Sequence, residues 1–62
     1  MIAVWSFDLR EKVDVLQNNN RFFFMRRNGR ELGDAIFDDL PEETTLKNLA
    51  VAMLDFIEEI DE

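Results

Sequence analysis

The sequence predicts a small α+β protein in which a small antiparallel sheet carries one short helix. Three observations predict this fold class: apolar and polar residues alternate from Val4 to Leu16, an aromatic run follows an asparagine-rich turn, and apolar residues from Glu31 to Leu40 have helical spacing. Alternation is typical of half-buried strands, and spacing of three and four residues is typical of helices. Residues 1–62 are expected to form a single domain, because a chain this short supports only one small core.

The first predicted strand is the segment Val4 to Leu16. Its apolar face carries five side chains, which are Trp5, Phe7, Leu9, Val13 and Val15. Glu11 falls on the same face, where it marks a bulge or an end of pairing. The residues Asn18 to Asn20 then predict a turn, because asparagine tolerates a left-handed backbone.

The second predicted strand, Arg21 to Arg27, is apolar on both faces. Phe22 and Phe24 point to one side, and Phe23 and Met25 point to the other. One of these faces must cover the core, and the pattern leaves open which one. The other face would be exposed in a monomer of this size, which predicts contact with a second subunit.

A short helix is expected from Glu31 to Leu40. The turn pair Asn28-Gly29 precedes it, and Pro41 ends it. Phe37 lies at the border between the acidic and apolar faces of this helix. The apolar face is formed by Leu32, Ala35, Ile36 and Leu40.

The last segment, Thr44 to Ile60, fits two patterns. Its apolar residues form a helical stripe, and the alanines and the glutamate-rich end agree with a helix. Residues Leu49 to Ile57 also fit a strand that is apolar on both faces, with Val51 and Met53 sharing one face. A β-hairpin followed by a C-terminal helix is therefore the alternative fold.

The net charge of −7 is divided unevenly along the chain. Residues 1–30 carry six basic and three acidic side chains, whereas residues 31–62 carry one basic and eleven acidic side chains. An acidic surface repels nucleic acid and attracts basic proteins, so we expect a protein partner and no nucleic-acid ligand. Two alternatives are nucleic-acid binding through the arginines and phenylalanines after Asn20, and a structural dimer whose charge only aids solubility.

The residue types present exclude several kinds of chemistry. Without cysteine or histidine, the chain has no disulfide, no common zinc site and no nucleophile–histidine pair. We expect no enzymatic activity, catalytic residue, metal site or cofactor, because carboxylates are the main candidates and no calcium-loop spacing is present. The start of the chain lacks the pattern of a secretory signal, and no apolar run reaches about 20 residues. A cytoplasmic protein without membrane contact is expected.

The segment Ser6 to Gly29 resembles the small phage-encoded inhibitors of uracil-DNA glycosylase. The matching features are Leu16-Gln17 at the end of a strand, a polar turn, the aromatic cluster Phe22 to Phe24, and Arg27 to Gly29. The family then has a short helix whose residues resemble Leu32, Asp34, Phe37 and Asp38.

This resemblance implies a homodimeric DNA mimic, with the element order β-β-α-β, that blocks a repair enzyme in the host cytoplasm. The glycosylase probes DNA with an apolar wedge and flips uracil out of the duplex. The resemblance implies that acids replace phosphates while apolar side chains capture the wedge. The expected target-binding residues are Glu31, Asp34, Ile36, Phe37, Asp38, Asp39 and Leu40.

The resemblance also implies that Leu49 to Ile57 is a strand buried in the dimer. The expected dimer interface consists of Phe22, Phe23, Phe24, Met25, Val51 and Met53. The alternative function is an acidic partner-binding protein, either antitoxin-like or an inhibitor of another DNA-binding defence enzyme.

Overall fold

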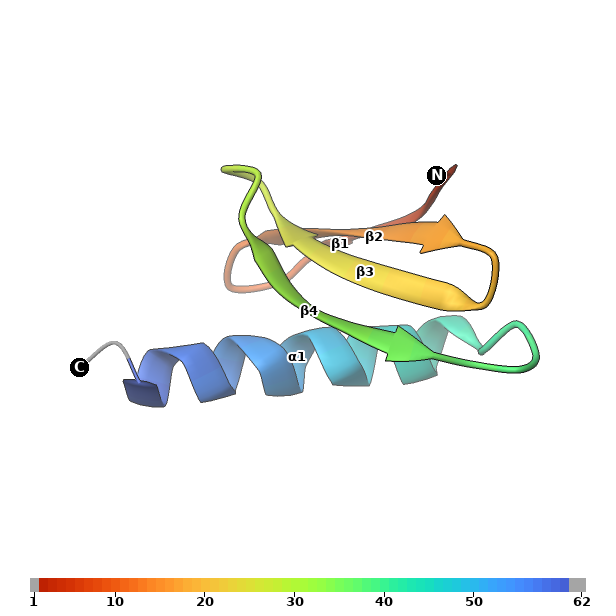
Figure 1. Ribbon diagram of the computed structural model, residues 1–62. Helices are drawn as coiled ribbons and strands as arrows, with labels where there is room; N and C mark the ends of the chain where they lie inside the picture. Colours follow the sequence, from red (N-terminus) through yellow and green to blue (C-terminus); the bar gives the residue numbers. More distant parts are fainter. Residues whose placement is uncertain (1, 61–62) are drawn as a thin grey trace.

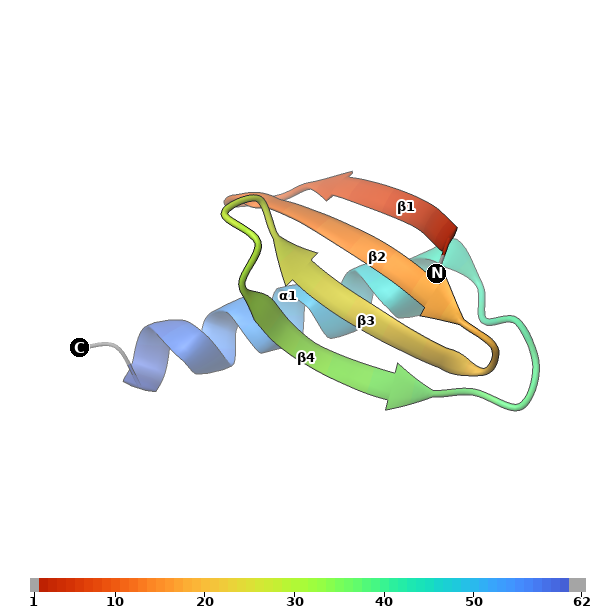
Figure 2. The same cartoon turned by 45° about the horizontal axis from the view of Figure 1, so that its top comes forward.

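The computed structural model describes residues 2–60, with side chains through residue 57, as a four-stranded antiparallel sheet and one helix. The strands β1, β2, β3 and β4 lie in chain order, and helix α1 crosses one face of the sheet (Figures 1 and 2). The predicted α+β class is confirmed. The predicted order β-β-α-β is wrong, because the helix follows all four strands. The elements are β1 Ile2–Asp8, β2 Lys12–Asn18, β3 Arg21–Arg26, β4 Glu31–Ile36 and α1 Glu43–Ile60.

The segment predicted as one long strand forms a hairpin of β1 and β2. The chain reverses around residues 9–11, where the backbone N–H of Leu9 donates to the carbonyl of Glu11 at 3.3 Å. Glu11 therefore ends the pairing, as one of its two predicted roles required. Phe7 lies opposite Val13 in the antiparallel register. The two strands thus keep their apolar residues on one face of the sheet. The alternating pattern is therefore the same for one long strand and for this hairpin, and it cannot distinguish them.

The turn between β2 and β3 confirms the prediction for the asparagines. Asn18 pairs with Arg21, and the two residues between them reverse the chain. Asn19 has a φ of 57°, a left-handed conformation that asparagine tolerates better than most residues. The side-chain amide of Gln17 donates to the carbonyl of Asn19 at 2.8 Å, which adds a further bond across the turn.

The predicted helix from Glu31 to Leu40 is wrong, because its first six residues form β4. The β3–β4 turn places Gly29 at a φ of 86° and directs the chain back along β3. Ala35 then pairs with Phe22, so β4 hydrogen-bonds to the edge of β3 that faces away from β2. Gly33 lies in the middle of the segment and disfavours a helix. Ten residues of helical spacing were too few to outweigh this pairing.

The last segment is a helix, so the strand expected from Leu49 to Ile57 is wrong. The helical periodicity of the residues gave the better prediction. Leu46, Ala50 and Leu54 are buried at four-residue intervals, which places all three on the face of α1 that packs against the sheet. Glu43 in the first turn interacts favourably with the positive end of the helix dipole.

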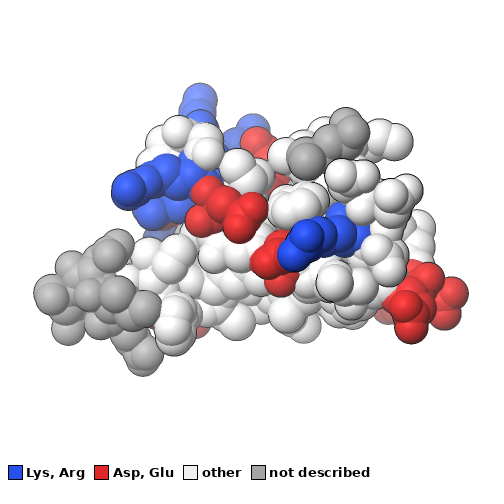
Figure 3. Space-filling view, in the orientation of Figure 1, with Lys and Arg blue, Asp and Glu red and all other residues white. Residues whose placement is uncertain are grey.

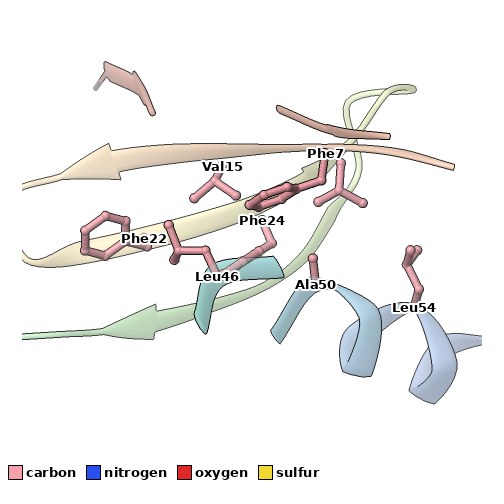
Figure 4. Packing of buried hydrophobic residues seen from close by; sticks show 8 residues of the cluster. Phe7, Val15, Phe22, Phe24, Leu46, Ala50 and Leu54 are labelled. Atoms are coloured by element: carbon pink, nitrogen blue, oxygen red, sulfur yellow. The ribbon is translucent and has the colours of Figure 1, made fainter. Parts of the chain in front are cut away.

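The core lies between the sheet and α1 (Figure 4). Met53 of α1 packs close to Gly33 of β4, where an added Cβ would lie 3.3 Å from the sulfur of Met53. No polar side chain is buried within the part of the chain that the structure describes. Each large core side chain contributes about 1.5–3 kcal/mol through its burial. The buried residues are Phe7, Val13, Val15, Phe22, Phe24, Leu46, Ala50 and Leu54.

Candidate protein-binding surface

The two faces of β3 have different surroundings. Phe22 and Phe24 are 1% and 0% exposed and lie in the core of the chain itself. Phe23 and Met25 are half-buried on the opposite face of the sheet, away from α1. Phe23 lies beside Leu16 of β2, and the guanidinium of Arg21 lies 5.5 Å from the centre of its ring. The sequence did not decide which face of this strand covers the core, and the structure shows that it is the face with Phe22 and Phe24.

The residues predicted for a dimer interface do not share one surface. Phe22 and Phe24 are enclosed in the core of the chain itself, which leaves their side chains almost no exposed surface for a second subunit. Met53 packs against the core near Gly33. Val51 lies on α1 with 38% of its surface exposed. Only Phe23 and Met25 stay together on the uncovered face of the sheet.

The residues predicted to bind a target gather mainly where β4 leads into α1. We call residues 36–43 the acidic end. Its acids are the exposed residues Asp38, Asp39, Glu42 and Glu43. Two apolar side chains stand among them, because Ile36 is 63% exposed and Leu40 is 71% exposed. Figure 3 shows acidic side chains at this end of the molecule.

Phe37 takes a different position from its two apolar neighbours. Its ring is half-buried and meets the ring of Phe22 edge to face, with centroids 5.6 Å apart and planes at 75°. Its backbone N–H donates to the carbonyl of Asn20 at 2.9 Å. Phe37 thus anchors the start of the acidic end to the core. Ile36 and Leu40 are the apolar residues that face solvent.

The other two predicted target-binding residues lie on β4, outside the acidic end. The carboxylate of Asp34 accepts a bond of 2.7 Å from the Nε of Arg21, so its charge is already paired. Glu31 is exposed at the start of the strand, opposite Met25. The predicted target-binding residues therefore fall into two groups. Five lie in the acidic end, and two lie on β4, where Asp34 forms an ion pair with Arg21.

The charges of the molecule are separated in space as well as in sequence. Between residues 2 and 57, the four acids of the acidic end make no ion pair. Arg27 and Arg30 are exposed near the β3–β4 turn, and Figure 3 shows basic side chains at this opposite end. Elsewhere carboxylates face arginines, as in the pairs Arg10–Asp55 and Arg26–Glu11. A basic partner would therefore be drawn to the acidic end.

The described residues contain no group of three or more carboxylates arranged to hold a metal ion. The pKa of Glu11 is lowered, mainly by its hydrogen bond from Arg26. Among the described helical residues, no stretch is both long and apolar enough to cross a membrane.

Sequence reasoning missed the surface at the outer edge of the sheet. Trp5 is 39% exposed and stacks on Phe7, with ring centroids 6.3 Å apart. Beside it lies an open hollow of about 400 Å³ lined by Ala3, Val4, Trp5, Ser6, Asp14 and Leu16. The available signal was the run from Ile2 to Phe7, which contains no charged residue.

No protein-family model, curated protein or solved structure matches this chain.

Proposed function

We propose that this protein is an acidic binding module whose acidic end occupies the basic surface of a DNA-binding protein. One observation carries the proposal: four carboxylates without ion pairs to described residues surround two exposed apolar side chains, Ile36 and Leu40. A DNA-binding surface offers the complementary chemistry, because it combines lysine and arginine side chains with groups that contact sugars and bases.

The two kinds of side chain have separate roles in this proposal. The carboxylates attract the partner and raise the rate of encounter, because electrostatic steering acts over about 8 Å at physiological ionic strength. Exposed ion pairs add little affinity, about 0–1 kcal/mol each. Leu40 and Ile36 supply the apolar contact that holds the complex, since buried anchors carry most of the energy of an interface.

A uracil-DNA glycosylase is the specific target that we propose first, and the sequence resemblance is its sole support. In this form of the proposal, Ile36 and Leu40 receive the apolar wedge of the enzyme, and Asp38 and Asp39 stand in for phosphates. Phe37 supports them from the core side. An inhibitor of another DNA-binding enzyme would use the same surface.

The test is a titration of uracil release from duplex DNA by a purified bacterial glycosylase. Wild-type protein should inhibit release, and Leu40→Ala should weaken inhibition by about tenfold or more while the protein remains folded. Val51→Ala is the matched control, because it shortens an exposed apolar side chain outside the acidic end. Failure of the wild type to inhibit at large excess would exclude this target.

The wider proposal is tested by retention of proteins from a bacterial lysate. Immobilised wild type should retain a basic DNA-binding protein that Asp38→Asn/Asp39→Asn does not retain. Asp8→Asn is the control for charge, because this exposed carboxylate lies at the end of β1, outside the acidic end. Equal retention by all three proteins would show that the acidic end is not the binding surface.

A further inference from the structure

The outer edge of β1 is not paired with any other strand in the part of the chain that the structure describes. Natural proteins protect such edges with charged side chains, proline, short strands or bulges. β1 is seven residues long and contains no proline, and its only charged residue is Asp8 at its end. Asp8 lies opposite Lys12 of β2. The one protective feature is a bulge near Val4, after which Trp5 to Asp8 continue in regular register.

The opposite edge of the sheet is protected. β4 carries the carboxylates of Glu31 and Asp34 within six residues, and it leads directly into the acidic end. Antiparallel pairing of two copies through β4 would bring the exposed carboxylate of Glu31 in one copy near the acidic end of the other, which is destabilising. The two edges therefore differ in kind, and β1 is the edge open to another strand.

The β1 edge also offers exposed apolar surface. Ile2 is 69% exposed and Trp5 is 39% exposed. The hollow beside Trp5 is lined by Ala3, Val4, Trp5 and Ser6 of β1 together with Asp14 and Leu16 of β2. When a strand adds to a sheet edge, backbone hydrogen bonds supply affinity and such hollows accept side chains of the added strand.

The distribution of charge indicates which strand can add to this edge. Each copy of the chain carries a net charge of −7, so two copies repel one another least where they meet through a surface without charge. Contact through the uncovered sheet face would bring together its acids, which are Asp8, Asp14, Glu31 and Asp34, against only two bases, Lys12 and Arg21. The β1 edge is nearly neutral, and a basic partner would be drawn to the acidic end instead.

We propose that β1 pairs antiparallel with β1 of a second copy about a two-fold axis. The two sheets then form one continuous sheet of eight strands, four from each copy. This arrangement is self-complementary and closes as a dimer, so no free β1 edge remains. It covers Ile2 and Trp5, and it leaves the acidic end of each copy open. The inference is independent of the proposed function.

Sedimentation equilibrium over micromolar to millimolar concentrations tests the dimer. The wild type should approach twice the chain mass of 7.4 kDa. Ile2→Lys should weaken the dimer by about tenfold or more, because a lysine at an edge opposes strand pairing. Ile36→Lys is the matched control, since Ile36 is 63% exposed on β4, and it should leave the dimer unchanged.

Hydrogen exchange of the wild type locates the contact without a substitution. Amides of β1 that point away from β2 should become protected as the protein concentration rises, whereas protection in β4 should stay constant. A monomer at every concentration would overturn the proposal. So would a dimer whose new protection falls outside β1, or one that Ile36→Lys weakens as much as Ile2→Lys.

Discussion

The ring of Phe37 meets the ring of Phe22 edge to face, with centroids 5.6 Å apart and planes at 75°. Phe22 is 1% exposed, so this contact joins the acidic end to the centre of the core. Phe37 also donates its backbone N–H to the carbonyl of Asn20, which lies in the turn between β2 and β3. The segment after β4 is therefore held in place at its first residue, and Leu40 is presented beyond this anchor.

Phe37→Ala should destabilise the protein by about 2–4 kcal/mol, because it removes a half-buried ring and its aromatic contact. Phe37→Leu keeps much of the apolar volume and should cost clearly less. Urea unfolding followed by circular dichroism measures both. Leu40→Ala is the control on the same segment, and it should change stability by no more than about 0.5 kcal/mol. An unchanged stability for Phe37→Ala would contradict the anchoring role.

Removal of the charges Asp38 and Asp39 should leave the fold unchanged and alter the salt dependence of binding. Asp38→Asn/Asp39→Asn should unfold at the same urea concentration as the wild type, because neither carboxylate makes an ion pair with a described residue. Its association rate with the partner should depend less steeply on salt, since fewer charges steer the encounter. Stopped-flow binding at several salt concentrations measures the slope. An identical slope would show that these acids lie outside the contact.

Much of the sheet was predictable from local patterns. The alternation in β1 and β2 identified their buried residues, and the asparagines identified the turn before β3. The hairpin inside the first predicted strand was missed for a physical reason. Its turn keeps the apolar residues on one face, and Leu9 to Glu11 contain no glycine, proline or asparagine to mark a reversal.

The position of the helix was harder to predict because two segments of the sequence have helical spacing, and one of them forms a strand. Glu31 to Ile36 has helical spacing, and its strand structure depends on pairing with β3, which is tertiary information. Glu43 to Ile60 has a longer helical stripe, and its periodicity alone predicted the observed helix. The resemblance implied a strand there, and the residues themselves have the helical period that the structure shows. The candidate surface differs from the prediction for the same reason, because the half-buried ring of Phe37 packs against the core while Ile36 and Leu40 are exposed.

The register of α1 on the sheet predicts opposite effects for two of its residues. Leu46 is fully buried, and Leu46→Ala should destabilise the protein by about 2–5 kcal/mol, which is a large part of the stability of a small domain. Val51 is 38% exposed, and Val51→Ala should change stability by no more than about 0.5 kcal/mol. Thermal melts followed by far-ultraviolet circular dichroism compare them. A strand that buries Val51 would give the reverse order.

The two glycines predict different costs for the same substitution. Gly29 has a φ of 86° with open space around it, so Gly29→Ala should cost about 1 kcal/mol through backbone strain alone. An alanine at Gly33 would have a normal φ, and its Cβ would lie 3.3 Å from the flexible end of Met53. A small movement of that side chain relieves the contact, so Gly33→Ala should change stability by about 0.5 kcal/mol or less. Urea midpoints of the two variants test this order, and Gly29→Asn should fall between Gly29→Ala and the wild type.

The paired bonds between Arg26 and Glu11 predict a stability term that depends on pH. The Nε of Arg26 donates to one carboxylate oxygen of Glu11 at 2.6 Å, and its Nη2 donates to the other at 2.8 Å. These bonds, helped by the charges of Arg26 and Arg10 and opposed by desolvation, hold the pKa of Glu11 below its ordinary value of 4.5. A lowered pKa in the folded state means that the carboxylate stabilises the fold at neutral pH. This contribution is lost as the pH falls through the lowered pKa.

Glu11→Gln should therefore be less stable than the wild type by about 0.5–1 kcal/mol at neutral pH, because the pair is partly exposed and the amide can still accept one bond. In acid below the lowered pKa, both side chains are neutral and the difference should disappear. Urea unfolding at the two pH values measures it. Glu31→Gln is the control, since this exposed carboxylate makes no ion pair with a described residue, and it should show no difference at either pH. If Glu11→Gln were less stable by the same amount at both pH values, residue 11 would act through packing. Its charge would then contribute nothing to the link between the β1–β2 turn and Arg26 of β3.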